Sequence, residues 1–512
     1  MGEIFFSFLL HSHMPYVRRN GDWPCGEEWI LEAWVESYLP IWDLIEDLSS
    51  GEIPAKLALT VTPVLAEQLQ DHYLQERLVG YMENRMRQAR EEVSRLKGMG
   101  DEPRVRLASW YHDRYDKWLE YFHSSLRGRM MEVLRQGIDS GRLEVLASAA
   151  THPHLPLLGN DVCRRAQIAV GLESYRRCFG RDPEGFWLPE CAYTRDLDHV
   201  LSEFSPPLKY VILDHSAIDV APEKACNWEP RRLGSTPLVA LLRDELAHDI
   251  LWSREGIPSH PHYREYSKRD HEGHGFQYWR ITSLDTPLDE KETYNPKNAL
   301  AQAGDDASAF AQALRRRREE AVSECAGRDT PGVILAAYDT ELFGHWWLEG
   351  PAWLREVLRL AGRFTELPSQ VASTAAAADP PPFSPRLTAW NAGGSFDNWI
   401  NPSTRDIWNQ VHGAEEDFLA HIHPQPDENP ESRRAIEQAA RELLLIEASD
   451  WTYMITRDQA AAYARDRFES HLKRYYSLMD MLRRRDFDLP AISALEETDK
   501  LFPWLNARHW KT

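Results

Sequence analysis

Four separated segments of this chain each end a run of apolar residues on side chains that can donate or accept protons. Residues two apart in a strand point to the same face, so a histidine pair with this spacing projects both imidazoles to one side. In a barrel of parallel strands the carboxyl ends converge on one mouth, which would bring all four segments into a single pocket. The segments are "FLLHSHMPY" with His11 and His13, "ASAATHPH" with His152 and His154, "GFWLPECAY" with Glu190, and "ILAAYDTELFGHWW" with Asp339.

Two reactions could use such a mouth. In a metal hydrolase, the paired histidines of the first segment, a further histidine and Asp339 would ligate zinc, which polarises a water molecule. In a glycosidase, one carboxylate attacks the anomeric carbon while a second protonates the leaving oxygen, and aromatic rings stack on the sugars. The four segments alone leave both reactions open.

The tryptophan content favours the carbohydrate interpretation. The chain has 19 tryptophans, and many stand beside His, Asp, Gly or Pro instead of inside aliphatic runs. Any single tryptophan is as often a core residue as a ligand contact. A metal hydrolase of small substrates has no need of such a set, whereas a sugar-chain cleft does. The tryptophans beside the candidate catalytic segments are Trp23, Trp29, Trp187, Trp346, Trp347, Trp390 and Trp399.

The elements that must position these groups follow from apolar and β-branched content. Seven segments have the composition of buried strands, and most intervals between them are long enough for a helical crossover. This alternation is typical of a parallel α/β sheet or barrel. The predicted strands are residues 3–13, 55–63, 143–152, 185–190, 209–216, 332–339 and 363–372.

Three further stretches depart from simple strand and crossover alternation. Residues 64–140 are charged and helical in period, which is too much helix for one crossover and predicts an inserted helical subdomain. Residues 374–386, "TAAAADPPPFSPR", are a proline-rich stretch that should not continue a helix or a central strand, so they predict a domain boundary. Residues 430–490 contain two clear amphipathic helices.

Bulk properties restrict the classes of partner. The formal net charge of −21 argues against a nucleic acid, whose binding depends on clustered Lys and Arg. The first 16 residues, "MGEIFFSFLLHSHMPY", lack a basic region and a long apolar run, so we expect a buried strand, no membrane span and a cytoplasmic protein. The six scattered cysteines predict reduced thiols and show no zinc cluster.

Five segments, in this order and at this spacing, resemble the five sequence regions of the glycoside hydrolases of family 57. Within that family they are most similar to its 1,4-α-glucan branching enzymes. The similarity extends over nearly the whole chain, and the third and fourth regions are the most specific. The segments are "HSHMPY", "ATHPHLP", "GFWLPECAY", "YDTELFGHWWLEGP" and "EASDWTYMI".

The resemblance implies an α/β fold, a (β/α)7 barrel that is an incomplete TIM-like barrel, over residues 1–385. The helical insertion at 64–140 belongs to it, and residues 386–512 would form a C-terminal helical domain that contributes to the substrate cleft. By motif position, Glu190 corresponds to the retaining nucleophile and Asp339 to the general acid/base. No metal or cofactor is implied. The substrate-binding candidates are His11, His13, Trp23, Trp29, His152, Trp187, His262, His345, Trp346, Trp390, Trp399, Asp450 and Trp451.

The implied mechanism is transglycosylation on an α-glucan, by a protein that we expect to be a monomer. Glu190, ionised, attacks the anomeric carbon while Asp339, protonated, gives its proton to the leaving oxygen. Desolvation by the flanking indoles would raise the pKa of Asp339. The 6-hydroxyl of a second glucan chain then intercepts the glucosyl-enzyme, which creates an α-1,6 branch.

Three departures from the branching-enzyme pattern keep alternatives open. Residues 214–242 contain no tyrosine to reach over the active site, and Trp228 is the only aromatic that could substitute. His262 stands where branching enzymes usually have tryptophan, and Pro153 and His154 replace a small residue and an aromatic. The rivals are an amylase or 4-α-glucanotransferase of the same family, a metal-dependent barrel hydrolase, and a silent glucan-binding protein. The presence of both acids argues against the last.

Overall fold

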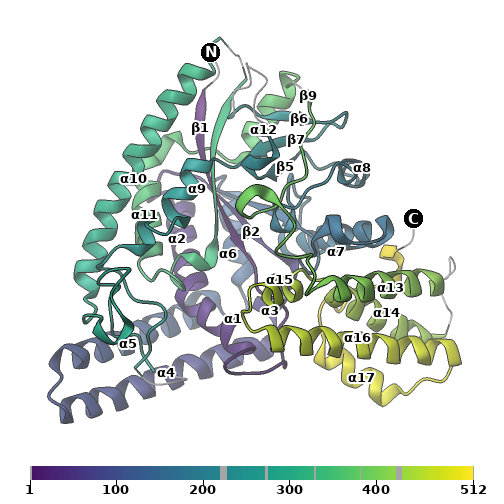
Figure 1. Cartoon of the computed structure of the whole chain (residues 1–512), viewed down its shortest axis with the longest axis horizontal. Coiled ribbons are helices and arrows are strands. Elements are labelled where there is room, and N and C mark those ends of the chain that lie inside the picture. Colours follow the sequence, from purple (N-terminus) through teal and green to yellow (C-terminus); the bar gives the residue numbers. More distant parts are fainter. Residues whose placement is uncertain are drawn as a thin grey trace.

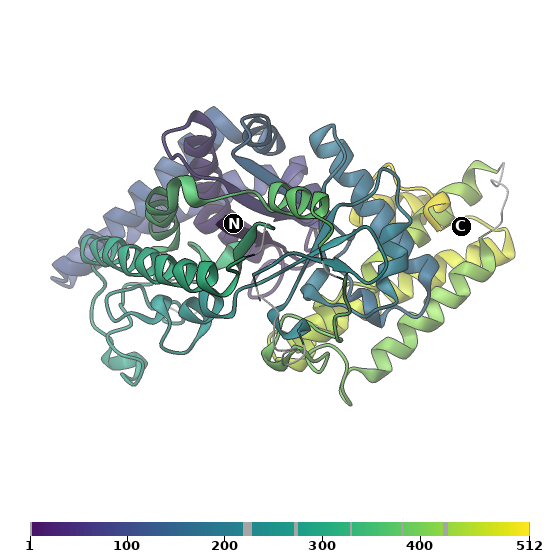
Figure 2. The same cartoon turned by 90° about the horizontal axis from the view of Figure 1, so that it is seen from above.

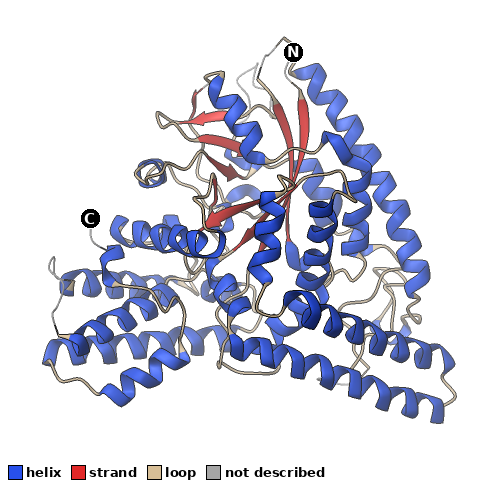
Figure 3. Ribbon diagram, turned by 180° about the vertical axis from the view of Figure 1, so that it is seen from behind, coloured by secondary structure: helices blue, strands red, loops and turns tan. Residues whose placement is uncertain are grey.

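The computed structural model describes residues 3–218, 228–270, 275–327, 330–380, 382–422 and 429–510. A curled sheet lies at its centre, with helices packed around the outside (Figure 3). The strand order is β8-β1-β2-β3-β4-β5-β7-β6-β9. The strands are β1 Ile4–Ser12, β2 Leu57–Val61, β3 Leu143–Ser148, β4 Gly185–Trp187, β5 Tyr210–Leu213, β6 Arg231–Leu233, β7 Val239–Leu242, β8 Gly332–Asp339 and β9 Pro382–Phe383.

Seven of these strands are parallel and form the barrel. Each neighbouring pair from β8 through β1 to β5 and β7 is parallel, whereas β6 runs antiparallel to β7. The barrel closes between β7 and β8, where Arg243 forms a parallel bridge with Leu335 and the Asp244 amide donates to the Leu335 carbonyl at 2.8 Å. The predicted (β/α)7 barrel is therefore confirmed.

Six of the seven predicted strands are present, and the seventh prediction was wrong. Residues 363–372 form a 3₁₀ turn and the start of helix α12, Pro368–Ala377. They meet the sheet through a bridge from Phe6 to Thr365 and a hydrogen bond from the Glu366 amide to the Phe6 carbonyl, and they do not add a strand to it. Proline is tolerated in a first helical turn, and the alanines that follow favour helix. The true seventh strand is β7, four apolar residues that are too short to show a period.

Helices occupy the intervals and cover the outside of the barrel (Figure 1). Residues 64–140, predicted as helical, contain α3 to α6, and α4 packs along α5 as a long hairpin. The helices are α1 Glu27–Ala33, α2 Leu39–Ser50, α3 Pro63–Gln70, α4 His72–Gly98, α5 Glu102–Tyr121, α6 Met130–Asp139, α7 Asp161–Phe179, α8 Leu197–Ser202, α9 Glu245–Trp252, α10 Pro296–Glu324, α11 Gly350–Ala361, α12, α13 Arg405–His421, α14 Pro430–Ile446, α15 Asp450–Thr456, α16 Ala461–Arg484 and α17 Leu489–Thr498.

The proline-rich stretch 374–386 is more structured than we predicted. Helix α12 continues to Ala377, because its alanines are strong helix formers, and Pro382–Phe383 form the edge strand β9. An edge is the position in a sheet where proline is tolerated, since it has no amide to donate. Beyond this stretch the chain is mainly helical, and α13 to α17 lie on the side of the barrel opposite α10 (Figure 2).

Two further expectations can be compared with the described residues. None of their helices combines the length and apolarity that crossing a membrane requires. Cys25, Cys163, Cys178 and Cys191 are free thiols, as expected. Cys325 is disulfide-bonded, which the scattered cysteine spacing did not predict.

Candidate active site

The inward faces of β1, β2 and β8 carry polar side chains at their carboxyl ends. Along β8 the alternate residues Leu335 and Ala337 belong to the apolar cluster inside the barrel, and Asp339 is next in the same alternation. His11 follows Leu9 on β1 in the same way, and lies level with Thr60 of β2 and Asp339 of β8. Because alternate residues share a face, the inward-facing side chains are apolar inside the barrel and polar at the carboxyl ends of the strands, which form the mouth.

Three imidazoles stack at this mouth. The ring centroid of His152 lies 3.9 Å from that of His13 and 5.0 Å from that of His11. The Nε2 atoms of His11 and His152 are 3.0 Å apart, and His11 Nδ1 lies 2.5 Å from the Thr60 hydroxyl. Below them, Trp187 is fully buried and stacks on His11 at 4.8 Å, so it supports the imidazole and offers no surface to a ligand.

Burial decides the charge of this stack. Desolvation, followed by the charge of His13, holds the pKa of His11 well below its usual value. Desolvation does the same for His152, with smaller contributions from the neighbouring imidazoles. Both rings are therefore neutral at neutral pH, so each ring has one nitrogen that donates a hydrogen bond and one that accepts.

Glu190 projects from a strained turn directly after β4. Its φ and ψ are 60° and 19°, Cys191 also has a positive φ, and so does His152. Non-glycine residues adopt this conformation only where the surroundings impose it, and such residues concentrate at functional sites. The Trp390 amide donates to the Glu190 carbonyl at 2.5 Å, and this contact holds the turn.

The Glu190 carboxylate meets groups from two other segments. Its Oε1 accepts a 3.4 Å hydrogen bond from the Ser449 hydroxyl and lies 3.7 Å from His152 Nδ1. Its side chain is 21 % exposed, so a ligand can reach it. Ser449 was not predicted, although it directly precedes Asp450 in the region "EASDWTYMI" that carried the resemblance.

The charge of a buried arginine, Arg243, acts on Asp339. Among the described residues no hydrogen-bond donor contacts its carboxylate, which leaves both oxygens for a ligand. Arg243 is 3 % exposed, pairs with Asp214 at 2.7 Å and lies over the Trp390 ring at 4.6 Å. Its charge acts on Asp339, and sequence reasoning missed it because it follows the short strand β7 that was also missed.

The two carboxyl groups interact electrostatically. Burial, followed by the charges of Asp450 and Asp339, raises the pKa of Glu190 to about 8. Burial also raises the pKa of Asp339 to about 6, against the opposing charges of Arg243 and His13. The pair therefore holds a single proton between about pH 6 and about pH 8, and Glu190 holds it more firmly in the unliganded site.

A third acid lies beside them. Glu341 Oε1 accepts hydrogen bonds from the Tyr38 hydroxyl at 2.5 Å and from the His13 amide at 3.2 Å. Burial, followed by the charge of Asp339, raises the pKa of Glu341 to about 8. Glu341 is 5 % exposed, so its side chain is part of the protein wall of the site and is not open to a ligand.

The C-terminal helices complete the mouth. His13 Nε2 lies 2.9 Å from Asp450 Oδ1, and His13 Nδ1 lies 3.0 Å from the Thr62 hydroxyl. Thr60 and Thr62 were not predicted, although "LTVT" repeats the two-residue spacing of "HSH" on the neighbouring strand.

Aromatic side chains stand at the rim near the end of β8. Trp346 is 37 % exposed and meets Trp252 edge-on at 6.0 Å. His345 lies between Glu36, at 3.3 Å from its Nδ1, and the Tyr266 hydroxyl, at 3.4 Å from its Nε2. Exposed indoles and polar rings in this order suit the alternating apolar faces and hydroxyl edges of a sugar chain.

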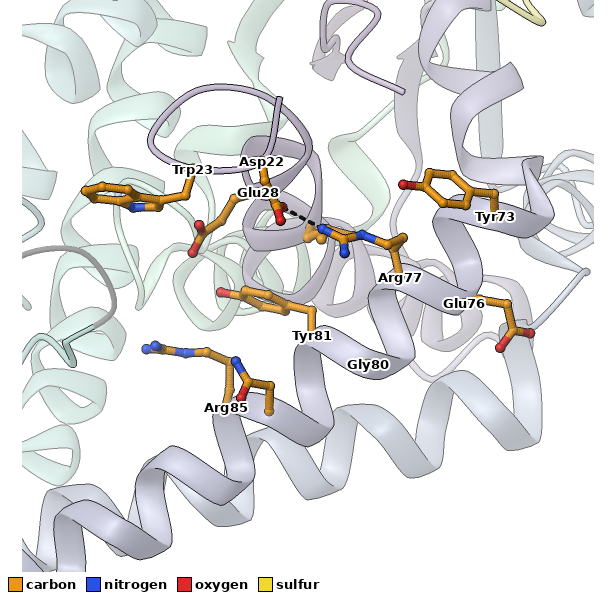
Figure 4. A pocket seen from close by; sticks show the side chains of 11 residues that line it. Asp22, Trp23, Glu28, Tyr73, Glu76, Arg77, Gly80, Tyr81 and Arg85 are labelled. Carbon is orange, nitrogen blue, oxygen red and sulfur yellow. Dashed lines mark hydrogen bonds and ion pairs between the residues drawn. The ribbon is translucent and has the colours of Figure 1, made fainter. Parts of the chain in front are cut away.

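Trp23 lies at a separate pocket, between the loop that precedes α1 and helix α4 (Figure 4), and Trp29 is not among the residues that line it. Trp23 is 49 % exposed and lines a pocket of about 510 Å³. Trp29 donates its indole N–H to the Pro24 carbonyl at 3.1 Å and meets the Tyr463 ring edge-on at 5.2 Å. The pocket's other lining residues are Asp22, Glu28, Leu31, Tyr73, Glu76, Arg77, Gly80, Tyr81, Asn84 and Arg85.

Three other predicted residues contact groups other than Glu190. Trp399 is fully buried against His154, and Trp451 is buried with its indole N–H donated to the Leu445 carbonyl at 2.7 Å. His262 is half-buried beside His260. Trp399 and Trp451 therefore pack inside the protein, and His262 contacts a neighbouring histidine.

The segment 214–242 is described only in part, because residues 219–227 lie outside the described residues. Trp228 cannot replace a tyrosine over the site. It is 5 % exposed, donates its indole N–H to Asp244 at 2.9 Å, and accepts at its carbonyl from Val333, near the start of β8 and far from Asp339. The expectation that Trp228 could substitute was therefore wrong.

The described residues contain two groups of three side chains that could hold a metal ion, and neither includes the stacked histidines or Asp339. Both ring nitrogens of His13 are engaged, by Thr62 and by Asp450. The imidazoles are thus arranged as hydrogen-bonding groups, and this favours the glycosidase interpretation over a catalytic zinc site.

Comparison with known proteins agrees with this geometry. Residues 7–246 match the family model for glycosyl hydrolase family 57, and residues 410–510 match that for the C-terminal region of 1,4-alpha-glucan branching enzyme. The chain is 35 % identical to the 1,4-alpha-glucan branching enzyme TK1436 of Thermococcus kodakarensis, over 97 % of this chain and 77 % of that protein.

Two solved structures are similar over the entire chain. The GH57-type branching enzyme from Pyrococcus horikoshii aligns with a TM-score of 0.90 at 32 % identity and covers 100 % of this chain and 97 % of its own. The alpha-amylase AmyC from Thermotoga maritima aligns with a TM-score of 0.87 at 28 % identity, and the alignment covers 100 % of this chain and 99 % of that protein. This chain belongs to glycosyl hydrolase family 57.

Proposed function

We propose that this protein is a 1,4-α-glucan branching enzyme. The observation that carries the proposal is the pair of interacting carboxyl groups, Glu190 and Asp339, that face a mouth built by the barrel and completed by Ser449 and Asp450. The C-terminal segment that supplies those two residues matches the branching-enzyme model, and the sequence relative of Thermococcus kodakarensis is a branching enzyme.

The first half-reaction cleaves an α-1,4 bond. Asp339 donates its proton to the leaving 4-oxygen while the Glu190 carboxylate forms a bond to the anomeric carbon, which releases the reducing-end fragment. Asp339 suits this role because it ends β8 at the mouth and no hydrogen-bond donor among the described residues contacts its carboxylate. Glu190 suits nucleophilic attack because the strained turn fixes its position.

When substrate binds, the shared proton must move from Glu190 to Asp339. In the unliganded site Glu190 holds it more firmly, yet attack requires an ionised Glu190 and a protonated Asp339. The Ser449 hydroxyl and the charge of His13 both favour the Glu190 anion. A glycosidic oxygen placed against Asp339 also favours the protonated form of that acid, since only this form can donate a hydrogen bond to it.

The second half-reaction transfers the glucan. Asp339, now ionised, takes the proton from the 6-hydroxyl of a second chain, and that oxygen displaces Glu190 from the anomeric carbon. The new bond is α-1,6 and the configuration is retained. The neutral imidazoles His11 and His152, together with Asp450, bind hydroxyls of the sugar beside Glu190, and Trp346 stacks on the chain at the rim.

The test is linkage analysis of the product. Purified protein is incubated with amylose, the product is debranched with isoamylase, and newly released chain ends are counted. We expect new α-1,6 linkages without a matching rise in free reducing ends. The Glu190→Gln protein should bind amylose and form no linkages, which separates turnover from adsorption. A product without α-1,6 bonds contradicts the branching assignment.

A second function is favoured by two specific observations. Residues 214–242 contain no tyrosine, and the Thermotoga maritima structure that aligns at a TM-score of 0.87 is an alpha-amylase. If water or a 4-hydroxyl reaches the glucosyl-enzyme first, the protein acts as an α-1,4-glucan hydrolase or 4-α-glucanotransferase. Rising reducing ends identify the hydrolase, and redistribution of linear chain lengths identifies the transferase.

We also propose the cellular setting. A chain with a net charge of −21 suits a neutral polysaccharide better than a nucleic acid or an anionic membrane. We place the protein in the cytoplasm, as a monomer that builds glycogen-like α-glucan without a catalytic cofactor. Light scattering of the purified protein tests the monomer, and linkage analysis of cellular glucan in a deletion strain tests the pathway.

A further inference from the structure

Three side chains, on or directly after separate helices, converge at the junction of the barrel and the C-terminal helices. They are Cys163 on α7, Glu415 on α13 and Glu447, which directly follows α14. Their sulfur and carboxylate oxygen atoms all lie within 4.8 Å of one another. All three side chains are buried, with Glu415 1 % exposed and the other two fully enclosed.

Each carboxylate in this group has one oxygen atom, Oε1, without a hydrogen-bond partner among the described residues, although the Asn160 amide also acts on Glu415 and the Cys163 thiol on Glu447. Oε2 of Glu415 accepts from the Gly159 amide at 2.9 Å, and Oε2 of Glu447 accepts from the Gln167 side-chain amide at 2.6 Å. The Oε1 atom of each has no hydrogen-bond partner among the described residues, and no lysine, arginine or histidine of that part of the chain forms an ion pair with either. Buried oxygens in this state are costly without a cation or a proton.

A neighbouring cluster shows how the same fold neutralises buried acids with its own cations. Glu442 and Asp499 are fully buried around His471, whose Nδ1 lies 2.7 Å from Glu442. There, Arg474 pairs with Asp499 at 2.5 Å, and Arg467 donates to His471 at 2.6 Å. No cation of the described residues forms an ion pair with the group around Cys163, although the charge of Arg164 acts on Glu415.

We propose that Cys163, Glu415 and Glu447 bind one divalent transition-metal ion of the Zn²⁺ class. A thiolate with two carboxylates suits Zn²⁺ better than Mg²⁺ or Ca²⁺, which prefer oxygen ligands alone. The ion displaces the thiol proton and any carboxyl proton, so binding releases protons. No local Cys or His motif in the sequence indicates this site, because its ligands come from α7, α13 and the residue after α14.

The site would fasten the C-terminal helices to the barrel. Ala448, next to Glu447, bridges to Pro153, and the Ser449 hydroxyl donates to the His152 carbonyl at 2.7 Å and to Glu190. An ion held by α7, α13 and the end of α14 fixes the turn that carries Ser449 and Asp450 to the mouth. Its role is structural, and it takes no part in bond cleavage.

The experiment uses the full chain. Protein purified without chelator, then chelator-treated and titrated with ZnCl₂, is measured for zinc content by elemental analysis and for thermal stability. Co²⁺ is added separately, because a thiolate ligand produces a sulfur-to-cobalt absorption band. We expect one zinc ion per chain, a Tm that falls on chelation and returns with Zn²⁺, and a cobalt band.

Matched variants separate this site from other thiols. Cys163→Ala should lose the metal, the Zn²⁺-dependent Tm shift and the cobalt band. Cys178→Ala removes a buried thiol from the same helix and should retain all three. Glu447→Gln preserves the side-chain shape and should weaken binding at least tenfold.

The outcomes distinguish this proposal from that of function. Wild-type protein that takes up no more Zn²⁺ than Cys163→Ala overturns the metal site, even if it branches amylose. Equal loss in the Cys178→Ala protein also overturns it. Glu190→Gln protein, which should be inactive, should still bind one zinc ion, so failure of the enzymatic proposal leaves the metal result intact.

Discussion

His13 and Asp450 are 437 residues apart in the chain and meet at 2.9 Å between Nε2 and Oδ1. His13 comes directly after the first barrel strand, and Asp450 opens α15 in the C-terminal helices. Each side chain is only 13 % exposed, so the contact is largely shielded from solvent and screened little by salt. The mouth around Glu190 therefore depends on both ends of the chain.

Replacing Asp450 should change both binding and the pH profile. In Asp450→Asn, the loss of a negative charge beside Glu190 removes one cause of its raised pKa. The Glu190 pKa should fall from about 8, so the basic limb of kcat/KM against pH moves to lower pH. KM for amylose should rise, because His13 loses its anionic partner. Asp458→Asn, at an exposed position just beyond α15, serves as the control and should leave both quantities unchanged.

The roles of the two acids can be tested by trapping. A fluorinated glucosyl donor that forms a covalent intermediate faster than it breaks down should add its mass to the peptide that contains Glu190. Asp339→Asn should lower kcat by about 10²–10⁴-fold on ordinary glucan, since proton donation is lost. A donor with a good leaving group should restore the first step in that variant. If the glucosyl label is found on the peptide that contains Asp339, then Asp339 is the nucleophile and Glu190 the general acid/base.

The pH dependence of activity should be bell-shaped. The active form holds one proton in the pair, because one acid must be ionised and the other protonated. Below about pH 6 a second proton binds, and above about pH 8 the last one is lost, so kcat/KM should fall on both sides. Initial rates measured from pH 4 to 10 on unbranched glucan check this, and a single rising limb through pH 9 contradicts it.

Arg243 should determine the pH at which kcat/KM falls on the acid side of that profile. Its charge lowers the pKa of Asp339, so Arg243→Gln should raise that pKa and move the acid limb to higher pH. Arg243→Lys retains a cation and should largely restore the limb. Removing Arg243 also takes the arginine partner from the buried Asp214, at a cost of about 3–5 kcal/mol, so thermal denaturation must show that the variant is folded at the assay temperature.

Two adjacent tryptophans should respond differently to truncation. Trp346 is 37 % exposed at the rim, so Trp346→Ala should raise KM for long glucans with little loss of stability. Trp347 is 2 % exposed, so Trp347→Ala should cost about 3–5 kcal/mol of unfolding free energy by opening a cavity. Denaturant titration and amylose kinetics on both variants check the contrast. A stable Trp346→Ala protein with unchanged KM shows that the rim does not bind the chain.

The sequence alone determined the barrel and most of the residues at its mouth. Alternation along "FLLHSHMPY" and "ILAAYDTELFGHWW" placed His11, His13 and Asp339 on inward faces, because a strand repeats every two residues whatever its neighbours are. Six of the seven barrel strands were predicted from the same kind of local pattern of apolar residues. The seventh, Val239–Leu242, is too short for a period to be visible, and Arg243 was missed with it.

Only the tertiary structure decided which polar groups act on one another. The contacts of Ser449 with Glu190 and of Asp450 with His13, and the charge of Arg243 acting on Asp339, join segments that no local pattern relates. It also showed Trp187 and Trp451 to be enclosed, since composition cannot tell an indole that faces sugar from one that fills a core. Burial and charge depend on distances across the fold, and those distances place the proton on Glu190 before substrate binds.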